Sequence, residues 1–89
     1  MIKAAIVGCG RHGLRYLEAS KTINGLKIGA LVDKNSKTCE GITSSFFYLD
    51  LAKMLVDYRP NLVIIATNGP SHFDIAKKAI ELGVEMLII

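Results

Sequence analysis

Short apolar runs alternate along this chain with segments whose apolar residues recur at helical spacing. The runs at residues 2–7 and 26–32 are mostly apolar and the run at 62–66 is continuous, which is typical of strands buried on both faces of a parallel sheet. Residues 11–20 and 71–83 carry apolar side chains three or four positions apart, which predicts two amphipathic helices. The clearest parts of the chain therefore alternate between strand and helix.

The middle of the chain has a weaker pattern. Residues 34–45 are polar and mixed, and a short helix at 37–42 is disfavoured by the glycine that it would contain. Residues 46–48 are expected to form a brief third strand. Asp50 is placed to cap a short helix that reaches Leu55.

Turn and cap residues separate the later elements. Residues 59–61 (Arg-Pro-Asn) predict a turn before the strand at 62–66. Residues 67–70 (Thr-Asn-Gly-Pro) are expected to end that strand. Ser71 and Asp74 have the spacing of a capping box, in which each side chain satisfies a free backbone N–H of the other. The apolar residues 84–89 are expected to form the last strand.

This order of elements predicts an α/β fold with a doubly wound parallel sheet. Parallel neighbours in one sheet need crossover connections, and these are almost always right-handed. We expect about five strands in the order 3-2-1-4-5, which is a Rossmann-like arrangement. The 89 residues are enough for one small domain.

Composition and charge argue against several classes of partner. The chain is 51% hydrophobic, but no apolar run approaches the roughly 18 residues of a transmembrane helix. The net charge of +3 comes from scattered Lys and Arg residues without interleaved aromatics, which speaks against nucleic-acid binding. Cys9 and Cys39 have neither disulfide-exchange nor metal-site spacing, so we expect reduced thiols and no metal. These features favour a cytoplasmic protein with no membrane partner.

A glycine-rich motif, Gly-Cys-Gly-Arg-His-Gly, follows the first strand and opens the first helix. In such a motif Gly8 makes the tight turn, Gly10 lets the backbone approach a pyrophosphate, and Gly13 lets the helix pack closely on the strand. The free N–H groups at a helix start, together with its positive dipole end, attract phosphate. The motif therefore predicts a dinucleotide site.

An acidic residue stands where this site needs one. Asp33 follows Gly13 by twenty residues, at the end of the second predicted strand, where its carboxylate can bind an adenosine ribose. A carboxylate there repels a 2′-phosphate, so NAD is favoured over NADP. The neighbouring Lys34 softens that repulsion, and we include it among the candidate cofactor-binding residues.

Structural interpretations of the same residues remain open. The glycine turn can serve packing alone, with Asp33 as a solvated strand end. Arg11 can screen a phosphate but contributes mainly its backbone N–H, and His12 suits a solvent-facing spacer; both are kept as cofactor-binding candidates. Cys9 suits a small filler between two glycines, and Lys77 with its neighbour Lys78 suits a solvated helix face.

Several segments together resemble a known family. The chain is similar to the N-terminal domain of the glucose–fructose oxidoreductase / inositol dehydrogenase (Gfo/Idh/MocA) family, and the likeness covers nearly its whole length. The most specific feature is an Ala-Thr strand end with a histidine five residues after the threonine. The segments that carry the likeness are residues 5–13, 30–33, 60–67, 70–76 and 79–83.

The resemblance implies an NAD(P)-dependent oxidoreductase that acts on sugars, cyclitols or related hydroxy compounds. The family's Ala-Thr-Pro-Asn-x-x-His segment lines the nicotinamide side of the cofactor, which maps here to Ala66, Thr67, Asn68 and His72. This chain departs from the pattern, because Asn68 stands where proline is common and Gly69 where asparagine is usual. His72 is equally compatible with a surface or capping-turn histidine.

The end of the chain also bears on function. The family's last strand runs into a Glu-Lys-Pro motif with a catalytic lysine, and Ile89 stands just before that point. The resemblance thus implies that residues 1–89 are a dinucleotide-binding domain, truncated before the family's catalytic lysine motif and substrate domain. On this interpretation the isolated chain has no catalytic residues and binds nucleotide only. The strand at 84–89 would leave an uncovered apolar edge, and we expect a homodimer or higher assembly through it.

Two further functions stay in view. A stand-alone module that senses or sequesters a dinucleotide would use the same residues as the cofactor half of a dehydrogenase. A methyltransferase-like Rossmann domain that binds S-adenosylmethionine is the third candidate, and the Ala-Thr…His segment speaks against it.

Overall fold

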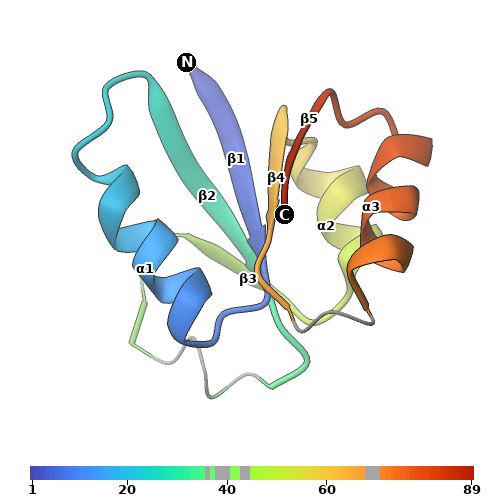
Figure 1. Ribbon diagram of the computed structural model, residues 1–89, viewed down its shortest axis with the longest axis horizontal. Helices are drawn as coiled ribbons and strands as arrows, with labels where there is room; N and C mark the ends of the chain where they lie inside the picture. The colour runs from blue at the N-terminus through green and yellow to red at the C-terminus, as the bar shows by residue number, and fades with distance from the viewer. Residues whose placement is uncertain (36, 38–40, 43–44, 68–70) are drawn as a thin grey trace.

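The protein forms one five-stranded sheet with helices on both sides (Figure 1). The computed structural model describes residues 1–35, 37, 41–42, 45–67 and 71–89. In chain order the elements are β1 (Ile2–Val7), α1 (Arg11–Ser20), β2 (Leu26–Val32), β3 (Phe46–Tyr48), α2 (Leu51–Tyr58), β4 (Leu62–Ile65), α3 (His72–Glu81) and β5 (Met86–Ile88).

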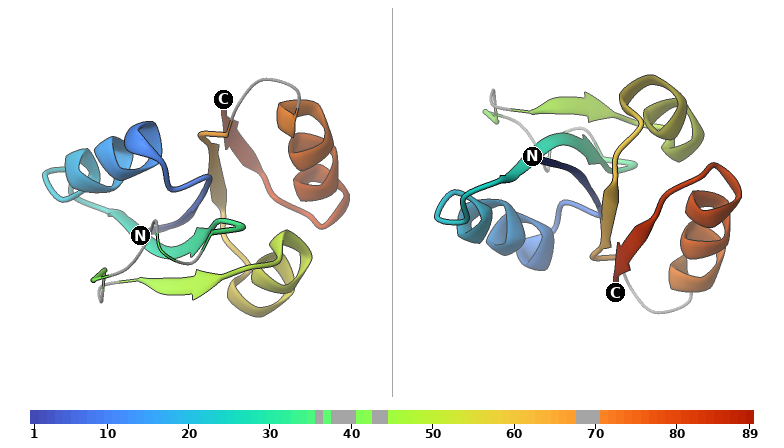
Figure 2. Two further views of the ribbon diagram at one scale, coloured as in Figure 1. Left: turned by 90° about the horizontal axis from the view of Figure 1, so that it is seen from below. Right: turned by 90° about the horizontal axis from the view of Figure 1, so that it is seen from above.

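All strand pairings are parallel, and the strand order is β3-β2-β1-β4-β5. This confirms the predicted doubly wound sheet in the order 3-2-1-4-5. The two views of Figure 2 show α1 on one side of the sheet and α2 with α3 on the other. Parallel strands covered on both faces explain why β1, β2 and β4 have mostly apolar rather than alternating sequences.

The core consists of two layers, one on each face of the sheet. Beneath α1, the side chains of Ile6, Leu31 and Ile64 form a buried cluster against which Leu17 packs. On the other face, Met54 of α2 and Ala79 of α3 pack against alternate residues of the same strands. Burying a large aliphatic side chain contributes about 1.5–3 kcal/mol, so these two layers supply the main stabilisation of the fold.

Most predicted elements are confirmed, with shifts at their ends. The helix expected to reach Leu55 continues to Tyr58, because Tyr58 also packs against the core. The last strand begins at Met86 rather than at residue 84, because the N–H of Val84 donates to the carbonyl of Ala79 and closes the end of α3. The tentative helix at 37–42 lies largely outside the described residues.

The two predicted helix caps had different outcomes. Asp50 caps α2 as expected, since its carboxylate accepts the N–H of Lys53 at 3.0 Å. The capping box at Ser71 and Asp74 is wrong. Ser71 already has a helical backbone and makes no side-chain cap hydrogen bond; its hydroxyl donates instead to the Thr67 hydroxyl at 2.8 Å.

One glycine in β2 is required by packing. The register between β1 and β2 shifts so that Ala4 pairs with Ile28 and Ala5 pairs with Ala30, which leaves Gly29 as the extra residue of a bulge. A Cβ on Gly29 would overlap the ring and hydroxyl of Tyr58. The absence of a side chain at Gly29 therefore leaves room for Tyr58, the last residue of α2, against the sheet.

No helix among the described residues is both long enough and apolar enough to cross a membrane.

Candidate functional site

The predicted site residues come together at the carboxyl edge of the sheet. The glycine motif follows β1, Asp33 follows β2 and Thr67 follows β4, and the three strands are neighbours (Figure 1). In open α/β sheets, ligands bind outside the carboxyl ends of the strands, where the strand order reverses. Here that reversal lies between β1 and β4.

The three glycines of the motif have three different surroundings. Gly8 has a φ of +93°, and a Cβ there would meet the backbone of Thr67. A Cβ on the buried Gly13 would overlap the carbonyl oxygen of Gly8, so α1 lies very close to the preceding turn. A Cβ on Gly10 would find no atom of the described protein within 4 Å. Two glycines thus serve the fold, and Gly10 leaves open space in front of the helix.

The start of α1 presents backbone N–H groups to that space. Within the described part of the chain, the N–H groups of Gly10, Arg11, His12 and Gly13 have no protein acceptor, while the carbonyl of Gly10 accepts the first helical bond from Leu14 at 3.0 Å. Free N–H groups are normal at a helix start and create a positive end. Gly10, Arg11 and His12 are exposed, so an anion can reach this end of the helix.

Asp33 is tied to the glycine motif. One carboxylate oxygen, Oδ2, accepts the N–H of Cys9 at 2.8 Å, and the other, Oδ1, accepts the N–H of Asn35 at 2.8 Å. A carboxylate has about four lone-pair sites, so Asp33 keeps acceptor capacity for a ligand. The Cys9 side chain is 1% exposed and packs in the core as the predicted filler, with its Sγ 3.7 Å from the carbonyl oxygen of Val32.

A cavity of about 430 Å³ opens beside these groups. Of the predicted site residues, Gly8, Asp33, Lys34 and Thr67 line it. Residues that the sequence analysis did not single out as site residues complete the wall. They are Val7, Val32, Leu49, Asp50, Leu51, Ser71 and Ile75.

The additional lining residues follow from the topology. Leu49 and Asp50 come directly after β3, so they belong to the same carboxyl edge as Asp33. This rule could have identified them from the sequence, because every strand of a parallel sheet ends at one edge. Ser71 could not have been identified that way, because its place depends on its bond to Thr67.

The end of β4 is held by the start of α3. Ser71 Oγ donates to Thr67 Oγ1, and Nε2 of His72 forms a hydrogen bond with the carbonyl oxygen of Thr67. Ala66 is half-buried and packs against the core cluster beneath α1, and its N–H donates to the carbonyl of Val7 at 2.8 Å. The predicted site residue Asn68 lies outside the described residues.

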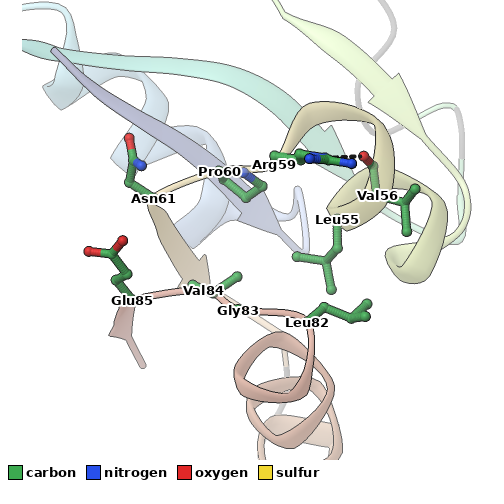
Figure 3. A pocket seen from close by; sticks show the side chains of 9 residues that line it. All are labelled: Leu55, Val56, Arg59, Pro60, Asn61, Leu82, Gly83, Val84 and Glu85. Carbon is green, nitrogen blue, oxygen red and sulfur yellow. Dashed lines mark hydrogen bonds between the residues drawn. The ribbon is translucent and has the colours of Figure 1, made fainter.

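A second cavity, of about 360 Å³, lies at the opposite edge of the sheet (Figure 3). It sits where α2 and α3 end and where β4 and β5 begin, and both polar and apolar groups line it. Arg59 at its rim donates from Nε to the carbonyl of Val56 at 3.3 Å. The lining residues are Leu55, Val56, Arg59, Pro60, Asn61, Leu82, Gly83, Val84 and Glu85. Among the elements that the structure describes, no helix begins at this edge, so it lacks the free N–H groups that a dinucleotide needs.

Among the described residues, no group of three or more His, Cys, Asp or Glu side chains is arranged to hold a metal ion. The chemistry of the carboxyl edge is therefore that of backbone N–H donors, one carboxylate and hydroxyl groups.

Comparison with known proteins agrees with this geometry. Residues 2–88 match the Gfo/Idh/MocA family model, described as an oxidoreductase family with an NAD-binding Rossmann fold. The chain is 35% identical to D-apiose dehydrogenase of Paraburkholderia graminis over 86 residues, covering 92% of this chain and 23% of that protein. It is 32% identical to inositol 2-dehydrogenase of Arthrobacter sp. over 91 residues, covering 97% of this chain and 27% of that protein.

Solved structures share the fold. An oxidoreductase from Agrobacterium radiobacter, crystallised with NAD+, L-tartaric acid and magnesium, superposes with a TM-score of 0.87 at 26% identity, covering 98% of this chain and 27% of that one. The chain thus spans about a quarter of the length of the relatives that it matches. It belongs to the Gfo/Idh/MocA family of oxidoreductases and has that family's NAD-binding Rossmann fold.

Proposed function

We propose that this chain binds NAD at the carboxyl edge of β1, β2 and β4, as the cofactor-binding part of a dehydrogenase. The observation that carries the proposal is the bond between Asp33 and the N–H of Cys9, which joins the carboxylate proposed to bind the ribose to the turn proposed to bind the phosphates. Gly8 of this turn and Asp33 both line the cavity at the carboxyl edge of the sheet. This is the arrangement that a dinucleotide needs, since its ribose and pyrophosphate are covalently linked.

The cofactor fits the residues that are present. The space in front of Gly10 is open, and the free N–H groups of Arg11 and His12 border it. We assign the pyrophosphate to this space and the adenosine ribose to Asp33. By its likeness to the family, the nicotinamide half is assigned to Ala66, Thr67, Asn68 and His72.

The preference for NAD over NADP rests on charge. The carboxylate of Asp33 would repel a 2′-phosphate at the ribose, and the hydrogen bonds from the N–H groups of Cys9 and Asn35 hold that carboxylate in place. Lys34 is exposed beside it and offsets part of the repulsion. We therefore propose discrimination in favour of NAD rather than complete exclusion of NADP.

The reaction class is proposed from the relatives. They are named as dehydrogenases of D-apiose and inositol, both polyhydroxylated compounds. When bound, NAD supplies a hydride acceptor, and the chain's own residues bind and orient it. We propose a sugar, cyclitol or related hydroxy compound as the substrate of the enzyme to which this chain contributes its cofactor site.

Calorimetric titration of the protein with NAD, NADP and S-adenosylmethionine tests the proposal. NAD should bind with saturation, NADP more weakly, and S-adenosylmethionine not at all. Tighter binding of NADP would contradict the assigned role of Asp33. Absence of binding by either dinucleotide would contradict the proposed function as a whole.

We also propose self-association through β5. Ile88 and Ile89 at the end of this edge strand are 43% and 67% exposed, and an exposed apolar edge can pair with the same edge of a second copy. Sedimentation equilibrium at high micromolar concentration should reveal a dimer or larger assembly; a strictly monomeric protein would contradict this. The thiol of Cys9 is buried in the core, which fits a reducing compartment, and we propose the cytoplasm.

A further inference from the structure

His72 makes its hydrogen bond within the protein rather than toward the cavity. Its Nε2 bonds to the main-chain carbonyl oxygen of Thr67, five residues earlier. A carbonyl oxygen can only accept, so Nε2 must carry the hydrogen. Among the described residues that line the cavity are Thr67 and Ser71, but His72 is not one of them. The contact that the imidazole makes through Nε2 is therefore with Thr67 and not with the cavity.

Thr67 in turn contacts the glycine motif. An ideal Cβ built on Gly8 would lie 2.7 Å from Thr67 Cγ2 and 2.9 Å from the Thr67 nitrogen, so the two residues are in direct contact. Gly8 is also fixed on its other side, because its N–H donates to the carbonyl of Val32 at 2.7 Å. A displacement of Thr67 would thus be transmitted to the turn that we assign to the pyrophosphate.

Two bonds from the start of α3 hold Thr67 in this place. His72 binds its main-chain oxygen, and Ser71 Oγ donates to its hydroxyl at 2.8 Å. Both bonds cross from the helix to the strand end, so they fix the distance between β4 and α3 at the cavity wall. Thr67 is held from two directions and cannot move away from Gly8 without breaking one of them.

We propose that His72 is a positioning residue, which holds Thr67 against Gly8 and so sets the turn that receives the pyrophosphate, and that it does not contact the nicotinamide through Nε2. The inference rests on the proposed function, because it assumes a dinucleotide at this turn. It differs from a direct contact in one measurable way. Loss of the His72 side chain should lower the affinity for every ligand that carries the diphosphate, whether or not the ligand has a nicotinamide.

Two variants separate the hydrogen bond from the shape of the side chain. His72→Phe keeps a ring but removes the donor, while His72→Gln keeps an amide N–H donor at about the reach of Nε2. Affinities for NAD and for ADP-ribose, which lacks the nicotinamide, are measured by calorimetry for both variants and the wild type. The loss of one hydrogen bond corresponds to about a tenfold change in affinity.

The expected result is that His72→Phe binds both NAD and ADP-ribose about tenfold more weakly, and that His72→Gln restores most of the affinity for both. A loss confined to NAD would overturn the inference in favour of a direct nicotinamide contact. Unchanged affinities in His72→Phe, or equal losses in both variants, would also overturn it. If the wild type binds neither ligand, the proposed function itself fails.

A measurement on the wild type covers the case in which His72→Phe does not fold. The ring nitrogen NMR shifts of His72 in the ligand-free protein, recorded above pH 8, where an ordinary histidine (pKa about 6.5) is neutral, should show the hydrogen on Nε2. This readout does not depend on cofactor binding. Observation of the Nδ1–H tautomer would overturn the inference, because Nε2 would then have no hydrogen to donate to Thr67.

Discussion

The carboxylate of Asp33, at the end of β2, accepts the backbone N–H of Cys9 in the glycine motif at 2.8 Å. The two residues are 24 positions apart in sequence and lie at the ends of the neighbouring strands β1 and β2. The bond therefore links these two strand ends. Asp33 is therefore both a part of the fold and a candidate ribose ligand. Its substitutions should separate these two roles.

Asp33→Asn and Asp33→Ala should differ in stability but not in the direction of their effect on NAD. Asparagine retains an oxygen that can accept the Cys9 N–H, whereas alanine leaves that N–H without its partner, which costs about 1–3 kcal/mol. Both variants lose the negative charge and should bind NAD more weakly, with less discrimination against NADP. Urea unfolding and calorimetry measure the two effects. Undiminished NAD affinity in both variants would refute the ribose contact.

Gly13→Ala should destabilise the fold even without ligand. A methyl group at this buried position would overlap the carbonyl oxygen of Gly8, so α1 must move away from the turn. Overpacking of this kind typically costs about 1–3 kcal/mol. A lower urea midpoint than that of the wild type is the expected result. An unchanged midpoint would show that the close approach of α1 to Gly8 is wrong.

Ionisation of Tyr58 should lower the free energy of unfolding at alkaline pH. Partial burial raises the pKa of Tyr58, although a hydrogen bond from the backbone of Gly29 lowers it and the proximity of Tyr48 raises it further. Because the pKa is higher in the folded state, its contribution to the free energy of unfolding is complete below about pH 10. That contribution is lost as the pH rises through the folded-state value.

The matched variant is Tyr58→Phe, which keeps the ring on the core and removes the ionisable group. Urea unfolding between pH 8 and pH 12 should show a steeper loss of stability for the wild type than for Tyr58→Phe above about pH 10. Parallel curves for the two proteins would mean that Tyr58 is as accessible to water in the folded as in the unfolded state.

Local sequence patterns predicted those features of the fold that local interactions decide. The apolar runs identified the strands because a parallel sheet buries both faces of each strand, and Asp50 was identified as a cap because its bond to Lys53 spans three residues. The wrong capping box at Ser71 has the opposite cause. Its hydroxyl donates to the hydroxyl of Thr67 at the end of β4, a tertiary contact that the residue types alone do not predict.

The same distinction applies to the candidate site. The spacing from the glycines to Asp33 placed both at one edge of the sheet, because strands of a parallel sheet end together. The pairing of Asp33 with Cys9 and the support of Thr67 by His72 depend on tertiary distances, so the sequence could not predict them. Sequence therefore identified the parts of the site, and the structure shows which of these parts hold one another.

The NAD affinity of Gly10→Ala tests the central claim most directly. Gly10 has φ −71° and ψ −162°, which alanine can adopt, and its Cβ would meet no atom of the described protein within 4 Å. The variant should therefore unfold at the wild-type urea concentration, in contrast to Gly13→Ala. If the pyrophosphate occupies that open space, calorimetry should show NAD binding weakened at least about tenfold, or about 1.4 kcal/mol. Wild-type NAD affinity in a stable Gly10→Ala protein would contradict the assignment of the cofactor to this turn.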